Sequence, residues 1–210
     1  MAMRVELDDN KMQRFMDPVM RLLRSHVHEF AAMEAGSSAL DVCCGTGDQA
    51  LYYSRRGIIA TGIDIDPCMV GAARAKSYKL GLKNVSFHTA SAQHLPFPDD
   101  VFDCASISAA IHENERSDID RIISEMRRVV KPDGALILVD YKVPLPRLIS
   151  AYFSFVLEYF AGRDHWRCFR DYMDQGGLDG ILERHGLHEE RRVEVGPLWL
   201  IKTTTTSGTG

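Results

Sequence analysis

The chain has 210 residues, of which 45% are hydrophobic and 26% are charged, and its formal net charge is -4. That length suits one sizeable domain of ordinary globular composition, and the acidic balance without a long basic run argues against nucleic acid as the main partner. The five cysteines have no regular spacing, so they do not indicate a disulfide framework. Since no apolar run reaches about 18 residues, we expect a cytoplasmic protein without a transmembrane segment.

Helical and apolar segments alternate along the first two thirds of the chain. A helix that we interpret as a lid is predicted over about 10–35, where apolar residues recur at helical spacing. Short apolar runs predict buried strands over 39–43, 58–64, 84–89, 101–110 and 135–141. The helices between these strands are predicted over 47–56, 67–80 and 118–130. Asp66 and Pro67 provide an N-cap and a preset φ for the second of these helices, and the segment KPDG (131–134) ends the third.

An insertion rich in aromatic residues, about 145–175, follows the fifth strand, and we expect it to cover the substrate. Its stretch LISAYFSFVLEYFAG (148–162) predicts an apolar helix too short to span a bilayer. The sheet domain, a second subunit, a membrane surface or an apolar substrate are all candidates to cover that helix. The next segment interleaves arginines with aromatic residues, so it either contacts an anionic group or forms an amphipathic lid whose arginines face water; these arginines are Arg163, Arg167 and Arg170.

The order of these elements predicts an α/β fold. Repeated β-α-β units with right-handed crossovers build a parallel sheet with helices on both faces. After a helix over about 176–185, the last two strands, 187–195 and 198–206, are separated only by Gly196-Pro197. Such a short link makes a hairpin, so it must add an antiparallel strand. We expect a single domain over 1–210, with a core that binds a cofactor at about 36–142.

The stretch ALDVCCGTGDQA (39–50) is the strongest local signal. Gly45, Gly47 and Ala50 fit the pattern G-x-G-x-x-A, and Asp64 ends the second strand where a carboxylate that binds ribose belongs. A glycine turn between a strand and a helix brings backbone N–H groups close to a ligand at the carboxyl ends of the strands. A turn that serves packing alone is the alternative.

Four ordered blocks carry a resemblance to a known family: LDVCCGTGD, TGIDIDPCMV, LPFPDDVFD and EMRRVVKPDGALILVD. Over roughly 36–142 the chain resembles the class I S-adenosylmethionine-dependent methyltransferases, and GTGD followed by Ala50 is similar to the ubiquinone and menaquinone C-methyltransferase branch. The resemblance implies a Rossmann-like sheet of seven mostly parallel strands in the order 3-2-1-4-5-7-6, with strand 7 antiparallel. It also implies that S-adenosyl-L-methionine is the cofactor and S-adenosyl-L-homocysteine the product.

The resemblance assigns roles to the matching positions. Asp41 and the glycine turn would face the methionine part of the cofactor, Asp64 would accept both ribose hydroxyls, and Ile65 would pack on the adenine. The implied cofactor-binding residues are Asp41, Cys43, Gly45, Thr46, Gly47, Asp64, Ile65, Ser91, Ala92, Gln93 and Ile107. Two of them depart from the family pattern: Cys43 replaces a glycine, so the turn must tolerate its Cβ, and Ser91 replaces an aspartate. The pair Cys43-Cys44 lacks partners at metal-binding spacing, and we expect no metal.

The acceptor is expected to be a small molecule bound beyond the fourth and fifth strands. His112 is the candidate catalytic residue because it follows the fourth strand and histidine titrates near neutral pH; a loop histidine without a chemical role is the alternative. The candidate substrate-binding residues are His112, Tyr141, Tyr152 and Trp166. The branch commonly has a glycine- and arginine-rich signature after the fourth strand, and AAIHENERSD stands there instead, which weakens a quinone assignment.

Rival functions stay open at this point. The G-x-G-x-x-A match also fits an NAD-dependent oxidoreductase, although the closing hairpin leaves no second nucleotide-binding half. A binding module that keeps the fold but methylates nothing is the other alternative. A nucleic-acid methyltransferase is disfavoured, because no Asn/Asp-Pro-Pro-Tyr block and no basic patch are present. A homodimer and a peripheral membrane contact are further open expectations.

Overall fold

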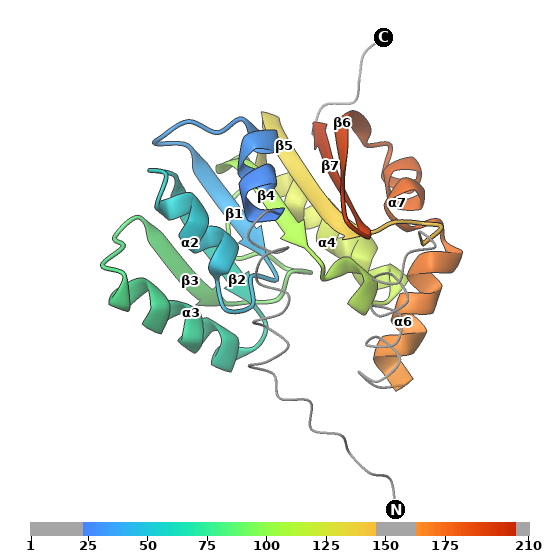
Figure 1. Cartoon of the computed structure of the whole chain (residues 1–210), viewed down its shortest axis with the longest axis horizontal. Helices are drawn as coiled ribbons and strands as arrows, with labels where there is room; N and C mark the ends of the chain where they lie inside the picture. The colour runs from blue at the N-terminus through green and yellow to red at the C-terminus, as the bar shows by residue number, and fades with distance from the viewer. Residues whose placement is uncertain (1–22, 146–162, 205–210) are drawn as a thin grey trace, which may run out of the picture.

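The computed structural model describes residues 23–145 and 163–204 and contains one seven-stranded sheet (Figure 1). The strand order is β3-β2-β1-β4-β5-β7-β6. The parallel strands are β1 (Ser38–Val42), β2 (Ile59–Asp64), β3 (Val85–Thr89), β4 (Phe102–Ser108) and β5 (Val130–Tyr141). β7 (Leu198–Thr204) runs antiparallel to both β5 and β6 (His188–Val195). The predicted fold class, strand order and closing hairpin are confirmed.

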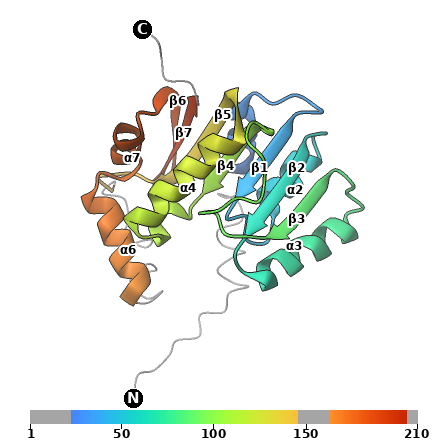
Figure 2. The ribbon, with the colours of Figure 1, turned by 180° about the vertical axis from the view of Figure 1, so that it is seen from behind.

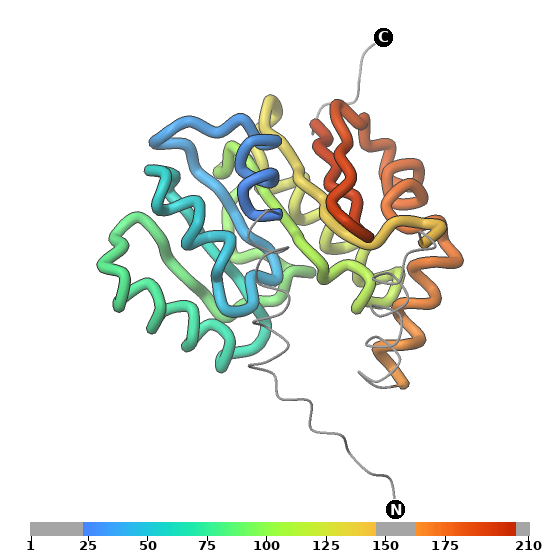
Figure 3. Tube along the Cα trace, viewed as in Figure 1, coloured from blue at the N-terminus to red at the C-terminus, as the bar shows by residue number. Residues whose placement is uncertain are grey.

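Helices cover both faces of the sheet. The helix over 23–31, α2 (Asp48–Ser54) and α3 (Pro67–Lys79) pack on one face, which Figure 1 shows in front. α4 (Arg116–Val129) and α7 (Gly177–His185) pack on the other, which Figure 2 shows. The short helix η1 (Ile111–Glu113) follows β4, and α6 (Arg163–Asp174) lies against it at the edge of the molecule. Figure 3 shows the path of the chain through these layers as a Cα trace, in the same view as Figure 1.

Two hydrophobic cores result from the alternation of side chains along the central strands. In β1, Leu40 and Val42 join the core under α4, whereas Ala39 joins the core under α2. Both faces are therefore buried, which explains why the central strands are continuous apolar runs. α4 presents its apolar stripe to one of these cores, through Ile119, Ile122, Ile123, Met126 and Val129. The side chain of Asp66 caps α3 as predicted, by accepting the amide N–H of Cys68.

Three differences from the predictions concern β5, β4 and the segment 145–175. β5 begins at Val130 rather than 135, because Val130 already pairs with Phe102. The register then shifts before Cys104 pairs with Ala135, so the KPDG segment forms an irregularity inside the strand pair. β4 ends at Ser108 rather than 110, because Ala109 has a φ of 53° and turns the chain into η1. Within 145–175, α6 is a helix that the sequence prediction did not delimit.

Two predicted helical segments fall wholly or partly outside the described residues. The apolar stretch 148–162, which includes Tyr152, lies outside them. The N-terminal lid is described only from residue 23 onward. Among the helices that the structure describes, none combines the length and the apolar character needed to cross a membrane.

Candidate functional site

A cleft of about 390 Å³ opens at the carboxyl ends of β1, β2 and β4. These strands flank the point where the strand order reverses, which is where open α/β sheets bind ligands. Strand ends, the loops after them and residues of α3, η1 and α4 supply its walls: Cys43, Gly45, Ile63, Asp64, Ile65, Met69, Ala90, Ser91, Ala92, Gln93, Ser108, Ala109, Ala110, Glu113, Asn114 and Ile122.

The turn after β1 depends on left-handed backbone at three positions. Cys43, Gly45 and Gly47 have φ values of 54°, 52° and 77°. A Cβ at Gly45 would meet no atom within 4 Å, so this glycine leaves space at the cleft wall. A Cβ at Gly47 would lie 2.5 Å from the ring of Phe87, so that glycine serves packing. Packing therefore explains Gly47 and does not explain Gly45.

Cys43 is an L-residue in this left-handed region, which costs roughly 1–2 kcal/mol relative to glycine. The turn therefore accommodates the Cβ at this position, as predicted, but its backbone is strained there. Burial and the nearby carboxylates of Asp64 and Asp41 raise the pKa of the Cys43 thiol to about 12. The thiol stays protonated at neutral pH, so it lines the cleft as a small apolar group.

Asp64 ends β2 and connects the two loops of the cleft. Its Oδ2 accepts the amide N–H of Gly45 at 2.8 Å, and its Oδ1 accepts the amide N–H of Asp66 at 2.9 Å. Each carboxylate oxygen retains a second acceptor site, so the group can still receive two hydroxyl hydrogens. The geometry suits a vicinal diol in the cleft.

Asp41 lies beneath the turn rather than in the cleft wall. It is 3% exposed and packs under α2, where the amide N–H of Ala50 and the side chain of Ser106 hydrogen bond to it. Burial raises its pKa from 3.8 to about 7, and those hydrogen bonds offset part of the rise. Its position supports the turn from below.

The other predicted cofactor residues divide into two groups. Ile65, Ser91, Ala92 and Gln93 line the cleft, and Ile65 is 73% exposed there. Thr46 instead contacts Asp48 and Lys76 on the outer side of the turn, with Oγ1 at 2.7 Å from the lysine Nζ. Ile107 is fully buried under α4, because the alternation of β4 directs it into that core.

A buried histidine-aspartate pair lies behind the cleft, where His112 directly precedes Glu113 of the cleft wall. His112 Nδ1 lies 2.6 Å from Asp140 Oδ1, and both side chains are almost fully buried. Asp140 Oδ2 also accepts the amide N–H groups of Ile111 and His112, at 3.0 and 3.2 Å. The aspartate thus fixes η1 and the imidazole together, and it leaves Nε2 as the ring atom that faces away from β5.

Aromatic rings surround His112 on the side away from the glycine turn. The Tyr141 ring centroid is 4.8 Å from that of His112, and the Phe169 centroid is 5.9 Å away. Trp166 stacks on Phe169 at 5.9 Å. This cluster places the predicted Tyr141 next to the predicted His112, and Phe169 connects the predicted Trp166 to both.

α6 carries the aromatic residues on its inner face and its arginines outside. Arg163, Arg167 and Arg170 are exposed, and Arg167 pairs with Glu115 at 2.6 Å. Of the two alternatives for this segment, the structure matches the amphipathic helix whose arginines face water.

The sequence prediction did not name Asp140, Met69 or Asn114, whereas Ser108 lies at the end of the fourth strand, beyond which the acceptor was predicted. Asp140 is the most informative, since a lone aspartate inside the apolar run ALILVDY signals a buried polar group that needs a partner. Ser108 lines the cleft, and its buried Oγ has no hydrogen-bond partner within the described part of the chain. Met69 and Asn114 also line the cleft, and no sequence pattern marks either of them.

Comparison with known proteins supplies independent evidence. Residues 39–134 match the model of a family described as a methyltransferase domain. A protein of Cellvibrio japonicus named ubiquinone/menaquinone biosynthesis C-methyltransferase UbiE is 31% identical over 186 residues, which cover 79% of this chain and 73% of that protein. A protein of the same name from Marinomonas sp. (strain MWYL1) is 32% identical over 184 residues, with 79% and 72% covered.

Among solved structures, a SAM-dependent methyltransferase from Aquifex aeolicus superposes with a TM-score of 0.68. The sequence identity is 24%, and the match covers 96% of this chain and all of that chain. At that identity the likeness shows a shared fold.

Proposed function

This chain belongs to the class I S-adenosylmethionine-dependent methyltransferases, as a relative of the UbiE proteins, and from that premise we propose that it methylates a small hydrophobic or aromatic acceptor. The observation that carries the proposal is the aromatic cluster around His112 beside the cleft. Family membership also replaces the oxidoreductase alternative that the G-x-G-x-x-A match left open.

The residues of the cleft fit S-adenosylmethionine. Gly45 leaves space where a side chain would block a ligand, and the buried hydroxyl of Ser108 needs a polar partner. Asp64 would hold the ribose hydroxyls, while the exposed apolar side chains of Ile65 and Met69 would cover the adenine. Asp41 would act from beneath, by keeping the turn in place.

When bound, the cofactor supplies an activated methyl group on a sulfonium, which is open to direct displacement. The protein must then align the acceptor and exclude water from the reacting atoms. Tyr141 and Trp166, which are partly exposed and pack on the buried ring of Phe169, would provide an apolar, aromatic wall for an acceptor of matching character.

We assign His112 the catalytic position. Because Asp140 holds Nδ1, Nε2 is the ring atom through which His112 would hydrogen bond the polar group of the acceptor or take its proton. The buried aspartate fixes the ring in one orientation, which a surface histidine without a chemical role would not require. The names of the relatives make a quinone precursor the first acceptor to test.

Two calorimetric titrations test the cofactor, one with S-adenosylhomocysteine and one with NADH. We expect binding of the first alone. A mass-shift assay with a panel of demethylated quinone precursors and simple phenols then tests the acceptor class. Trp166→Ala should raise the KM for an aromatic acceptor and leave S-adenosylhomocysteine affinity unchanged, whereas Tyr78→Ala, a change at an exposed aromatic residue on α3, should alter neither. An unchanged KM for the acceptor in Trp166→Ala would contradict the proposed acceptor wall.

A further inference from the structure

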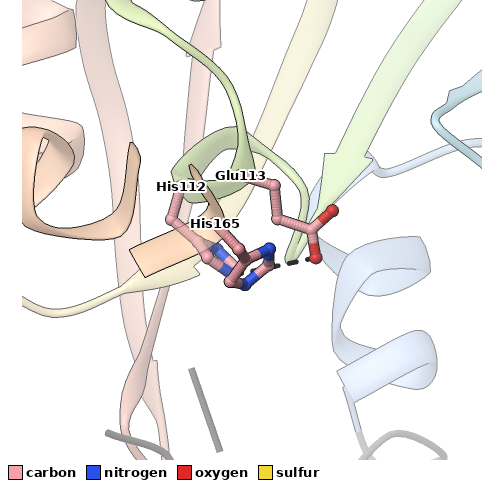
Figure 4. A group of neighbouring side chains, drawn as sticks. All are labelled: His112, Glu113 and His165. Carbon is pink, nitrogen blue, oxygen red and sulfur yellow. Dashed lines mark ion pairs between the residues drawn. The ribbon is translucent and has the colours of Figure 1, made fainter. Parts of the chain in front are cut away.

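Three side chains with metal-binding atoms converge beside the cleft. His112 and Glu113 come from η1, and His165 comes from the first turns of α6 (Figure 4). One ligand atom from each lies within 4.8 Å of the other two. The dashed line in Figure 4 marks the approach of His112 Nε2 to Glu113 Oε1, at 4.0 Å. The cluster joins segments far apart in the sequence, so residue spacing gave no sign of it.

One member of the cluster is already oriented as metal-binding histidines are. Such histidines usually hydrogen bond through their second ring nitrogen to a carboxylate or a carbonyl, which fixes the ring. Asp140 supplies this contact to Nδ1 of His112 at 2.6 Å, and backbone N–H groups hold the aspartate in turn. The outer support of a metal site is therefore built into β5 and η1.

The remaining adjustment is small. Ligands about 2.0–2.2 Å from a zinc ion lie about 3.3–3.5 Å apart in a tetrahedral arrangement. The separation between His112 Nε2 and Glu113 Oε1 is 4.0 Å and the other separations are at most 4.8 Å, so the ligand atoms must close by at most about 1.5 Å. Glu113 can supply much of this movement, because its side chain is half exposed. His165 is also partly exposed, on α6.

We propose that His112, Glu113 and His165 form a binding site for a divalent transition-metal ion, with zinc(II) as the representative of its class. Two imidazoles and one carboxylate suit such ions better than magnesium or calcium, which prefer all-oxygen sites. Three protein ligands leave a position open for a further ligand. Glu113 lines the cleft, so this open position lies between the cleft and the aromatic cluster.

The ligand for that position is an oxygen atom of the acceptor, such as a phenolate or an enolate; this part rests on the proposed function. The ion would then hold the acceptor oxygen in place of a direct contact with His112 Nε2. An acceptor bound this way loses its proton more readily, because a divalent cation stabilises the oxyanion.

Zinc(II) titration of chelator-treated protein, followed by calorimetry, tests the site. The wild type should bind one equivalent. His165→Ala and Glu113→Gln should weaken binding by at least about 100-fold, and Asp140→Asn by about 10–100-fold. His188→Ala is the matched control, since it removes an exposed histidine from β6 and should leave the affinity unchanged. Cobalt(II) absorption separates this site from the cysteines, because thiolate ligands add an intense charge-transfer band that the proposed ligands lack.

Circular dichroism of each metal-free variant shows whether it is folded, and His165→Ala is the decisive variant because its side chain is partly exposed. Equal zinc(II) affinity in His165→Ala and the wild type, or a thiolate band with cobalt(II), would overturn the site. S-adenosylhomocysteine titration of the same samples keeps the two proposals apart. Normal nucleoside binding in a wild type that binds no zinc(II) would refute the metal site and leave the proposed function standing.

Discussion

Asp41→Asn should change how stability depends on pH. Asp41 has a pKa of about 7 in the folded protein against 3.8 as a model value, so the folded state holds its proton more tightly than the unfolded state. Between these two values the native state binds one proton more, and the free energy of unfolding must fall as pH rises. The shift of about 3 units corresponds to about 4 kcal/mol in total, of which about 2 kcal/mol falls between about pH 5 and pH 7 and about 3 kcal/mol between about pH 5 and pH 8. Asparagine has a similar shape and does not titrate.

Urea unfolding of both proteins at about pH 5 and about pH 8 measures this effect. The free energy of unfolding of the wild type minus that of Asp41→Asn should fall by about 3 kcal/mol from the lower to the higher pH. Taking the difference cancels the titration of all other groups. A difference that stays constant within about 1 kcal/mol would show that Asp41 is ionised throughout, and it would refute the argument from burial.

Gly47→Ala should lower the free energy of unfolding by about 2–5 kcal/mol, because the new Cβ would clash with Phe87 and the left-handed backbone would be strained. Gly45→Ala has the same backbone strain but open space around its Cβ, so it should lower the free energy of unfolding by only about 1–2 kcal/mol. Chemical denaturation of the pair tests this, and equal losses would contradict it. Asp64→Ala should weaken S-adenosylhomocysteine binding, with each lost charge-assisted hydrogen bond worth about 1.5–3 kcal/mol; calorimetry with unchanged affinity would sink the ribose assignment. Arg128→Ala should lower the melting temperature, by removing hydrogen bonds from its guanidinium to two carbonyls of the loop after β3; an unchanged melt would show that the loop is held otherwise.

The sheet was predictable because the signals that specify it are local. Four of the five parallel strands contain a short apolar run, and Gly196-Pro197 allows only a hairpin. β3 alternates apolar and polar residues instead, and it is mostly exposed rather than buried as predicted, because it lies at the edge of the sheet. The start of β5 was not predictable, because KPDG has a strong turn signal that the pairing of Val130 with Phe102 overrides. Tertiary contact prevails there over local preference.

The candidate site was predictable on its cofactor side and less so on its acceptor side. The positions of Gly45, Asp64 and Ser91 follow from motifs within single turns. The contact between His112 and Asp140 joins η1 to β5, and the approach of His165 joins α6 to η1. No spacing rule contains such contacts between segments far apart in the sequence. Ile107 was predicted to bind the cofactor only because of its position in the motif. The alternation of side chains along β4 directs it into the core instead.

The two strands at the reversal of the sheet order leave it in the same unusual way. Cys43 after β1 and Ala109 after β4 are both L-residues with left-handed backbone, at φ 54° and 53°, and both line the cleft. Glycine would adopt either conformation without that steric cost. Selection for heat resistance should therefore favour glycine at these two positions early. The variants selected would have less rigid cleft walls. At these two positions, higher stability and a well-defined binding site therefore favour different residues.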